Sequence, residues 1–325
     1  MDSGSGLYLE FDNNRFLALL FGEHDQFLHR IENLLDVEIS ARGNSVVIKG
    51  DVLSSKIAEA VMQKLYSRIK KGNIVSIGEV DAAVRMAIAA KNTENSHNPE
   101  FQEDKIKIQT KRKVIMPRSP GQEVYMDVLQ HNRLVFAIGP AGTGKTYLAV
   151  ATGISLLLDG KVDRLILSRP AVEAGEKLGF LPGDLREKID PYLRPLYDAL
   201  YDMLPNVQVT KMIESDQIEV APLAFMRGRT LANSYIILDE AQNTTAAQMK
   251  MFLTRMGEGA YMVVTGDKTQ IDLPTGQLSG LKDAEEVLRD VKDIAFMYLD
   301  VKDVVRHPLV SKIVTAYEKR DNRPD

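Results

Sequence analysis

The sequence predicts an α/β protein, with one mainly parallel sheet in a large core and a small α+β unit ahead of it. The first observation is a series of short, almost continuously apolar segments at 133–138, 164–168, 235–238, 261–265 and 294–299. Helical stretches separate these segments, and strands of this kind are typical of a parallel sheet covered on both faces. The second observation is that the alternation begins only near residue 121, so the residues before it belong to a different unit.

The composition agrees with a soluble globular protein and excludes several classes of function. The chain has 325 residues, of which 44% are hydrophobic and 26% are charged, so it can bury sizeable cores. Its formal net charge of −4 argues against a uniformly basic nucleic-acid coat, although a local basic patch is compatible with it. The absence of cysteine excludes disulfides, thiol catalysis and cysteine-bound metals. We expect a cytoplasmic protein without a membrane segment, because the start of the chain is polar and the apolar run at 16–21 is too short to cross a bilayer.

Residues 1–90 predict the small α+β unit. Strand patterns occupy 7–11, 37–40 and 46–49, and helical patterns occupy 13–21, 26–35 and 52–71. The longest of these helices places Ile57, Val61 and Leu65 on one face, which is the face expected to meet the sheet.

Residues 91–120 are predicted to be a linker. The part at 91–104 is polar and lacks periodicity. The part at 105–118 carries six basic residues and no acidic one, with an alternation that suggests a short strand with one solvated face. Two interpretations remain open for it, a site for RNA phosphates or a strand edge that resists aggregation. The basic residues are Lys105, Lys107, Lys111, Arg112, Lys113 and Arg118.

A phosphate-binding loop is predicted at the start of the core, which we assign to residues 121–325. The sequence GPAGTGKT at 139–146 fits the pattern G-x-x-x-x-G-K-[ST], follows an apolar strand and opens a helix at 147–158. Glycines let successive backbone N–H groups face phosphate oxygens, and the helix N-terminus adds positive charge. Lys145 is expected at the β- and γ-phosphates and Thr146 on Mg²⁺. The full set of expected nucleotide contacts is Gly139, Pro140, Ala141, Gly142, Thr143, Gly144, Lys145 and Thr146.

An acidic pair follows the strand at 235–238. Asp239 is expected to supply the carboxylate for Mg²⁺, and Glu240 to polarise a water beside the γ-phosphate. An acid at the second position favours hydrolysis over phosphoryl transfer to a small molecule. The alternative is a pair of solvated carboxylates at a strand end.

Two further polar residues are weaker candidates. Gln270, in the stretch that follows the strand at 261–265, is the candidate sensor of the γ-phosphate, with Asp267 as its support. Gln122, on a short helix ahead of the first core strand, is the candidate adenine contact, because an amide both donates and accepts hydrogen bonds.

These motifs resemble the ATPase cores of superfamily-one helicases. Three further segments, at 168–200, 222–231 and 303–310, make the chain closely similar to the PhoH-like protein family of bacterial cytoplasmic ATPases. The resemblance covers nearly the whole chain. It implies a single RecA-like P-loop NTPase core that uses ATP and Mg²⁺, with catalysis through Asp239 and Glu240. It also implies a connection with RNA metabolism and with a YbeY-type endoribonuclease as partner.

The small unit resembles a KH-like RNA-binding domain, with one departure. A KH domain clamps nucleotides with a G-x-x-G loop between two helices. Here the corresponding turn, 22–25, reads Gly-Glu-His-Asp, so it lacks the second glycine and carries two acids that repel phosphate. A degenerate KH domain used for protein contact therefore competes with RNA binding.

A missing arginine predicts a homo-oligomer. Superfamily-one helicases complete the active site with an arginine from a second core domain, and this chain has one core. We expect a ring, with a hexamer as one candidate size, whose sites lie at subunit boundaries. Arg306 is the first candidate and Arg255 the second, the alternative for each being a helix cap or a surface ion pair. For Arg169, which ends the second strand, a contact with the nucleic-acid backbone, as in helicases, competes equally with substrate sensing or a subunit contact, because Glu173 and Glu176 follow it.

The leading hypothesis is an Mg²⁺-dependent ATPase in RNA metabolism, with RNA helicase-type activity. The alternative is a nucleotide-switched adaptor that regulates an endoribonuclease partner without unwinding RNA. A kinase is a third hypothesis, disfavoured by Glu240 and by the helicase-like third element.

Overall fold

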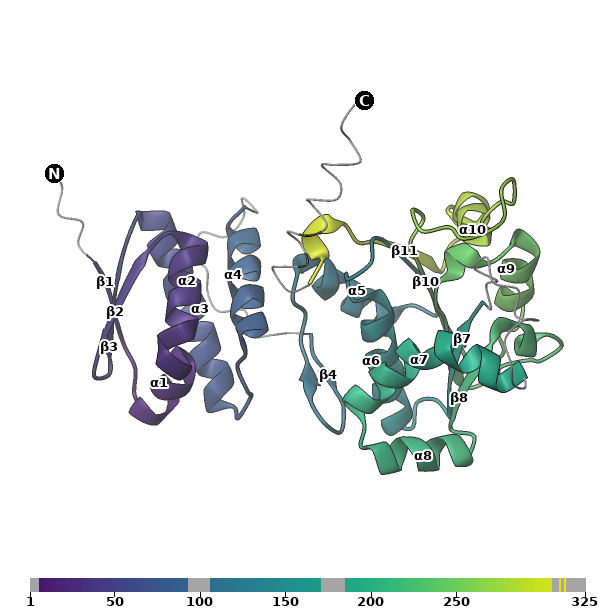
Figure 1. The fold of residues 1–325 in the computed structure, drawn as a ribbon, viewed down its shortest axis with the longest axis horizontal. Helices are drawn as coiled ribbons and strands as arrows, with labels where there is room; N and C mark the ends of the chain where they lie inside the picture. The colour runs from purple at the N-terminus through teal and green to yellow at the C-terminus, as the bar shows by residue number, and fades with distance from the viewer. Residues whose placement is uncertain (1–5, 93–105, 171–184, 306–309, 311–312, 314–325) are drawn as a thin grey trace. The chain divides into compact units, whose positions relative to one another are not determined.

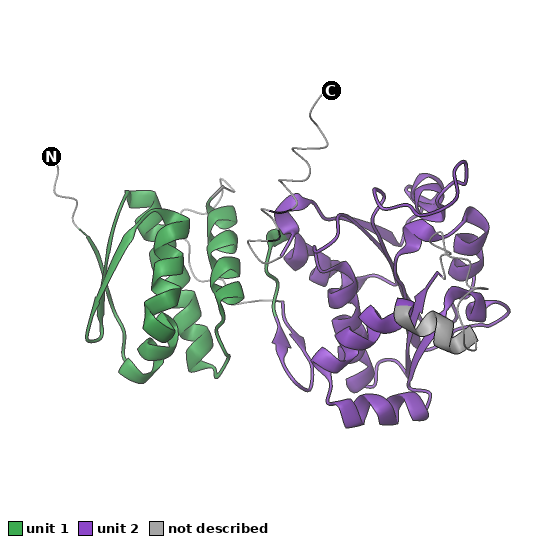
Figure 2. Cartoon of the chain, viewed as in Figure 1, with its two compact units in different colours: residues 1–105, 116–120 green, residues 106–115, 121–325 purple. Residues whose placement is uncertain are grey.

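The chain forms two compact units in a computed structural model that describes residues 6–92, 106–170, 185–305, 310 and 313. Residues 1–105 and 116–120 make up the smaller unit, and residues 106–115 and 121–325 make up the larger unit (Figure 2). Each unit has a hydrophobic core of its own. Within the described ranges, no helix is long and apolar enough to cross a lipid bilayer.

The smaller unit is a three-stranded antiparallel sheet with helices packed on one face (Figure 1). The strands, in the spatial order β1-β3-β2, are β1 (Leu7–Glu10), β2 (Glu38–Arg42) and β3 (Ser45–Lys49). The helices are α1 (Asn14–Phe21), α2 (Gln26–Leu35), α3 (Val52–Lys70) and α4 (Ile77–Asn92). The sequence predicted all of these strands and the first three helices.

Helix α4 is the element of this unit that the prediction lacked. Its apolar side chains are spread around the helix instead of forming one stripe, so the 3.6-residue period is weak. Val80, Ala83 and Val84 are nevertheless buried, because α4 packs against both α2 and α3. Helix α4 thus completes the smaller core. Its beginning lay in the predicted small unit, and its last residues lay in the predicted linker.

The larger unit contains a six-stranded sheet in which every pair of neighbouring strands is parallel. This sheet confirms the predicted α/β class, since all five apolar segments are strands in it. The sixth, β8, was not predicted, because its sequence IEVAP contains an acid and ends on proline, and it lies at an edge of the sheet. The spatial order is β11-β6-β10-β9-β7-β8, with β6 (Leu134–Ile138), β7 (Arg164–Arg169), β8 (Ile218–Pro222), β9 (Ser234–Leu238), β10 (Tyr261–Gly266) and β11 (Ile294–Tyr298).

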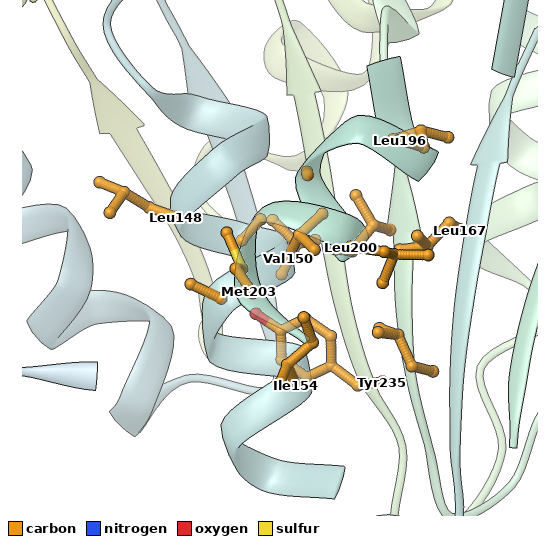
Figure 3. Close-up of a cluster of buried hydrophobic side chains, with 14 of the residues drawn as sticks. Leu148, Val150, Ile154, Leu167, Leu196, Leu200, Met203 and Tyr235 are labelled. Atoms are coloured by element: carbon orange, nitrogen blue, oxygen red, sulfur yellow. The ribbon is translucent and has the colours of Figure 1, made fainter. Parts of the chain in front are cut away.

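Helices cover both faces of this sheet (Figure 1). They are α5 (Pro120–His131), α6 (Lys145–Leu158), α7 (Leu185–Met203), α8 (Asn206–Glu214), α9 (Ala246–Leu253) and α10 (Gly280–Leu288). On the face covered by α6 and α7, Val150, Ile154, Leu200, Met203 and Tyr235 pack together (Figure 3). On the opposite face, Phe252 of α9 and Leu281 of α10 are fully buried. The sheet is therefore held from both sides.

The segment at 106–115, predicted as part of the linker, is a small hairpin of the larger unit. Its strands are β4 (Ile108–Gln109) and β5 (Val114–Ile115), which pair antiparallel. Ile108 and Ile115 are buried in the larger hydrophobic core. The basic residues Lys107, Lys111, Arg112 and Lys113 are exposed, so the hairpin has a solvated side, as predicted.

Candidate nucleotide-binding site

The phosphate loop joins the carboxyl end of β6 to the N-terminus of α6. Gly142 and Gly144 have φ of +85° and +83°, values at which a side chain would be strained. A Cβ at Gly139 would collide with the carbonyl oxygen of Leu299, which follows β11. Three of the motif's glycines are therefore required by backbone geometry. The loop places the N-terminus of a fourteen-residue helix at the edge of the sheet, as an anion site requires.

Lys145 lies inside this loop and is 9% exposed. Its Nζ donates to the carbonyl oxygens of Gly139 and Pro140, at 2.6 and 2.8 Å. Phosphate oxygens carry full charge and are stronger acceptors for an ammonium group than neutral carbonyls. The lysine is thus held beside the position that the motif assigns to phosphate, by contacts that an anion can replace.

Asp239 follows β9 and connects three elements of the core. Its Oδ1 accepts hydrogen bonds from Thr146 Oγ1 on α6 at 2.6 Å and from Thr265 Oγ1 on β10 at 2.7 Å. Its backbone N–H donates to the carbonyl oxygen of Ser168 on β7 at 2.8 Å. The carboxylate is 6% exposed, so these contacts fix it next to the phosphate loop.

The same cluster fits a magnesium ion. Mg²⁺ prefers oxygen ligands and is usually held by one or two carboxylates together with substrate phosphates and water. Asp239 and Thr146 supply a carboxylate and a hydroxyl oxygen within hydrogen-bonding distance of each other. Ser168 Oγ, on the neighbouring strand, is buried without a hydrogen-bond partner in the described part of the chain. A hydrated cation would bring water to such an orphaned hydroxyl.

Glu240 occupies a constrained position directly after Asp239. Its φ is +52°, in the left-handed region, and it precedes a short 3₁₀ turn, η4 (Ala241–Asn243). Its Oε1 lies 3.2 Å from Arg169 Nη2, and its Oε2 accepts from Gln242 Nε2 at 2.6 Å. The carboxylate is therefore held by one hydrogen bond, from Gln242, and by one ion pair, with Arg169.

Gln242 is a site residue that the sequence reasoning missed. Its amide nitrogen holds Glu240, and its Oε1 accepts from the backbone N–H of Asp267 at 3.0 Å. It is 1% exposed, and a polar residue with that burial needs partners. The available signal was an amide two residues after the second acid of the pair, at a buried strand end.

The third predicted element lies beside these residues, at the end of β10. Asp267 is 6% exposed, and its Oδ1 accepts from the backbone N–H and the hydroxyl of Thr269. The backbone N–H of Gln270 donates to the Asp267 carbonyl oxygen at 3.1 Å, whereas the Gln270 side chain is exposed. Asp267 thus shapes the turn that carries Gln270, and the sensing role of Gln270 stays a prediction.

Helix α5 supports the phosphate loop from the other side. Gln122 is buried, and its Nε2 donates to the Thr143 carbonyl oxygen at 3.0 Å. Tyr125 donates to the Lys145 carbonyl oxygen at 3.1 Å. Burial, and next the nearby Tyr235 and Asp239, raise the pKa of Tyr125 well above its usual value, which keeps its hydroxyl a donor. The Gln122 amide is directed at the loop backbone here, and its adenine contact stays a prediction.

The segment after β11 also reaches the loop. The backbone N–H of Val305 donates to the Gly142 carbonyl oxygen at 2.9 Å. Asp303, in the 3₁₀ turn η5 (Val301–Asp303), accepts from the backbone N–H of Gly121 at 3.1 Å. Arg306, the first candidate for the arginine in trans, lies outside the described residues.

Arg255, the second candidate, is engaged within its own unit. Its Nε donates to the Met251 carbonyl oxygen, and its Nη1 donates to the Arg229 carbonyl oxygen, both at 3.0 Å. These contacts cap α9 and fix the strand connection beside it. They agree with the helix-cap interpretation that the sequence left open.

Several residues of the predicted basic segment are paired within the chain. Arg118 lies 2.7 Å from Glu79, and Lys113 Nζ lies 2.6 Å from Asp202 Oδ1. Burial raises the pKa of Asp202, but hydrogen bonds from Lys113 and Tyr147 outweigh it and lower the pKa below its usual value. Lys105 lies outside the described residues. Lys107, Lys111 and Lys113 of the hairpin are exposed, and Lys113 is the one of these paired with Asp202.

Together, the parallel sheet and the glycine loop define the class, an α/β protein with a P-loop nucleotide-binding core. The family model described as "PhoH-like protein" matches residues 114–318. The PhoH-like protein of Bacillus subtilis (strain 168) is 51% identical over 93% of this chain and 94% of its own length. The PhoH-like protein of Mycobacterium tuberculosis (strain ATCC 25618 / H37Rv) is 50% identical over 92% of this chain and 84% of its own length. The chain belongs to the PhoH-like protein family.

Two further similarities are more distant. Protein PhoH of Escherichia coli (strain K12) is 45% identical over 205 residues, which are 62% of this chain and 58% of that protein. Among solved structures, the Pif1 helicase of Candida albicans has a TM-score of 0.33 and 15% identity, over 63% of this chain and 48% of that one.

Proposed function

We propose that this member of the PhoH-like family is an Mg²⁺-dependent ATPase that acts in RNA metabolism in the cytoplasm, with RNA helicase-type activity. The observation that carries the proposal is the buried Asp239 carboxylate, which is hydrogen-bonded to Thr146 at the mouth of the phosphate loop. A buried carboxylate beside an anion-binding loop is unfavourable unless a cation joins the two.

Different residues of the site bind the phosphates, hold the cation and orient the attacking water. The loop N–H groups and Lys145 bind the β- and γ-phosphates, and Asp239 with Thr146 holds the cation. Asp239 and Thr146 would hold Mg²⁺, which would supply positive charge against the phosphates. Glu240, held by Arg169 and Gln242, orients a water toward the γ-phosphate.

The test is ATP binding by calorimetry together with phosphate release, in wild-type protein and in Lys145→Ala. We expect turnover to fall about 10²–10³-fold in the variant, since a donor to developing negative charge is lost. Lys161→Ala is the matched control, because Lys161 is an exposed lysine just beyond the other end of the same helix. Wild-type binding and hydrolysis in Lys145→Ala would contradict the proposal.

The proposed active form is a homo-oligomeric ring in which an arginine crosses the subunit boundary. Arg306 is the candidate on sequence grounds, since it stands in the segment DVVRHP just after the last strand of the sheet. Arg306→Ala should keep ATP affinity and lose about 10³–10⁵-fold in turnover, the range known for arginine fingers. The molar mass in solution, with and without ATP, checks the assembly, and a strict monomer in both conditions would contradict it.

A second candidate function is a nucleotide-switched adaptor that regulates an endoribonuclease partner, of the YbeY type, without unwinding RNA. The observation that favours it is the internal pairing of Lys113 and Arg118, which reduces the basic surface available to RNA. ATPase rates with and without single-stranded RNA separate the two. Stimulation that disappears in Glu240→Gln supports the first function, and an unchanged rate supports the adaptor.

A further inference from the structure

The starting observation is an ion pair between two strand ends that are far apart in sequence. Strands β7 and β9 are parallel neighbours, with Ser168 opposite Leu238. The residues that follow these partners therefore meet at the carboxyl edge of the sheet. There, Arg169 Nη2 lies 3.2 Å from Glu240 Oε1, with the two side chains 21% and 33% exposed.

Arg169 also contacts a third element. Its Nη1 donates to the Tyr192 carbonyl oxygen, in α7, at 2.9 Å. A guanidinium is planar and presents its donors in a fixed fork, so the group that holds Glu240 is itself oriented by the backbone of α7. A lysine has one compact ammonium group and cannot reproduce this bridge.

The Glu240 carboxylate keeps room for a water in this arrangement. One oxygen faces Arg169 and the other accepts from Gln242. An ionised carboxylate has about four acceptor positions, and the Gln242 hydrogen bond takes one of them, so acceptor positions remain for a water. The hydrogen bond on one oxygen and the ion pair on the other restrict the direction in which the remaining positions point, and direction is what a water-orienting group requires.

The backbone at Glu240 supports the same conclusion. A glutamate in the left-handed region is strained and persists only where surrounding contacts hold it. Partial burial makes the ion pair less screened by solvent than a pair on an open surface.

We propose that Arg169 is a positioning residue, which fixes the orientation of the Glu240 carboxylate and makes that orientation depend on the place of α7. This inference rests on the proposed ATPase function. In the described part of the chain, the polar contacts of the Arg169 side chain are with Glu240 and Tyr192, and none is with the phosphate loop. Its loss therefore alters the reaction and leaves nucleotide binding in place.

The experiment compares Arg169→Ala, Arg169→Lys and Arg164→Ala. Arg164 is an exposed arginine at the opposite end of the same strand, so it is the matched control. We expect Arg169→Ala to lower kcat about 10- to 100-fold, the scale expected from misplacing a catalytic group by about 1 Å. The dissociation constant for ATP, measured by calorimetry, should stay within about twofold of wild type, and Arg169→Lys should recover part of kcat.

A double-mutant cycle with Glu240→Gln provides a readout that a merely structural role would not give. If Arg169 acts through Glu240, Arg169→Ala causes no further loss in the Glu240→Gln background. Rate losses that multiply, or a wild-type kcat in Arg169→Ala, would overturn the inference. Should Arg169→Ala fail to fold, Arg169→Lys decides: reduced kcat with unchanged ATP affinity supports the inference, and wild-type kcat overturns it. A wild-type chain that hydrolyses no ATP instead overturns the proposed function, and the inference with it.

Discussion

The turn at Glu240 in the larger unit and the turn at His24 and Asp25 in the smaller unit share one backbone feature. All three residues have left-handed φ, at +52°, +53° and +58° respectively. Such conformations are uncommon outside glycine and are often taken as a mark of a functional site. Both turns were also candidates on sequence grounds, one for catalysis and one for RNA clamping.

Their surroundings differ. Glu240 is held by Arg169 and Gln242 at the edge of a buried sheet. Glu23, His24 and Asp25 are exposed, and no side-chain hydrogen bond or ion pair to them occurs in the described ranges. A left-handed residue therefore indicates a functional site when neighbouring side chains hold its own side chain in place, as at Glu240. Without such contacts, as at His24 and Asp25, it indicates only a tight connection between helices.

The largest expected difference between the two turns is in turnover. Glu240→Gln should lower kcat for ATP about 10²–10⁴-fold, the usual contribution of a positioned general base, with ATP affinity retained. Glu23→Gln, the same change in the smaller unit, should leave kcat unchanged. Steady-state phosphate release measures kcat for both variants. Equal losses in the two would show that Glu240 has no special part in turnover.

A smaller difference is expected in stability. His24→Gly relieves left-handed strain and removes no polar contact, so we expect a gain of about 0.5 kcal/mol after the entropy cost of glycine. Glu240→Gly should gain less, because the pairing with Arg169 and Gln242 is lost with the side chain. Urea denaturation followed by circular dichroism measures the difference. A larger gain at Glu240 would show that its contacts contribute nothing.

The smallest expected effect is on RNA binding. The double variant Glu23→Gln, Asp25→Asn removes the acids of the turn at 22–25, and we expect RNA affinity to stay within about twofold, because this turn lacks the second glycine of a nucleotide clamp. Fluorescence anisotropy with labelled single-stranded RNA at fixed salt measures it. Tenfold tighter binding would show that the turn faces RNA after all.

Elements with a strong local signal could be predicted from the sequence. The phosphate loop has a fixed residue spacing between an apolar strand and a helix, and the five apolar strands have no polar interruption. These features depend on near neighbours in the chain. The parallel sheet therefore followed from the pattern before any long-range contact was known.

Elements defined by long-range contacts could not be predicted in this way. Strand β8 is recognisable by its pairing with β7, and α4 by its two helical neighbours, since neither has a clear period. The contact between Arg169 and Glu240 depends on strand order, which residue type does not reveal. Gln242 was overlooked for the same reason, because its partner Asp267 lies on a turn after another strand.

The hydrogen bond between Val305 and Gly142 offers a way to observe the site directly. Because the natural chain has no thiol, a single cysteine introduced at Val304 would be the one attachment point for a maleimide dye. A fluorophore there would sit one residue from Val305, which contacts the phosphate loop, and its emission would report nucleotide arrival and departure in real time.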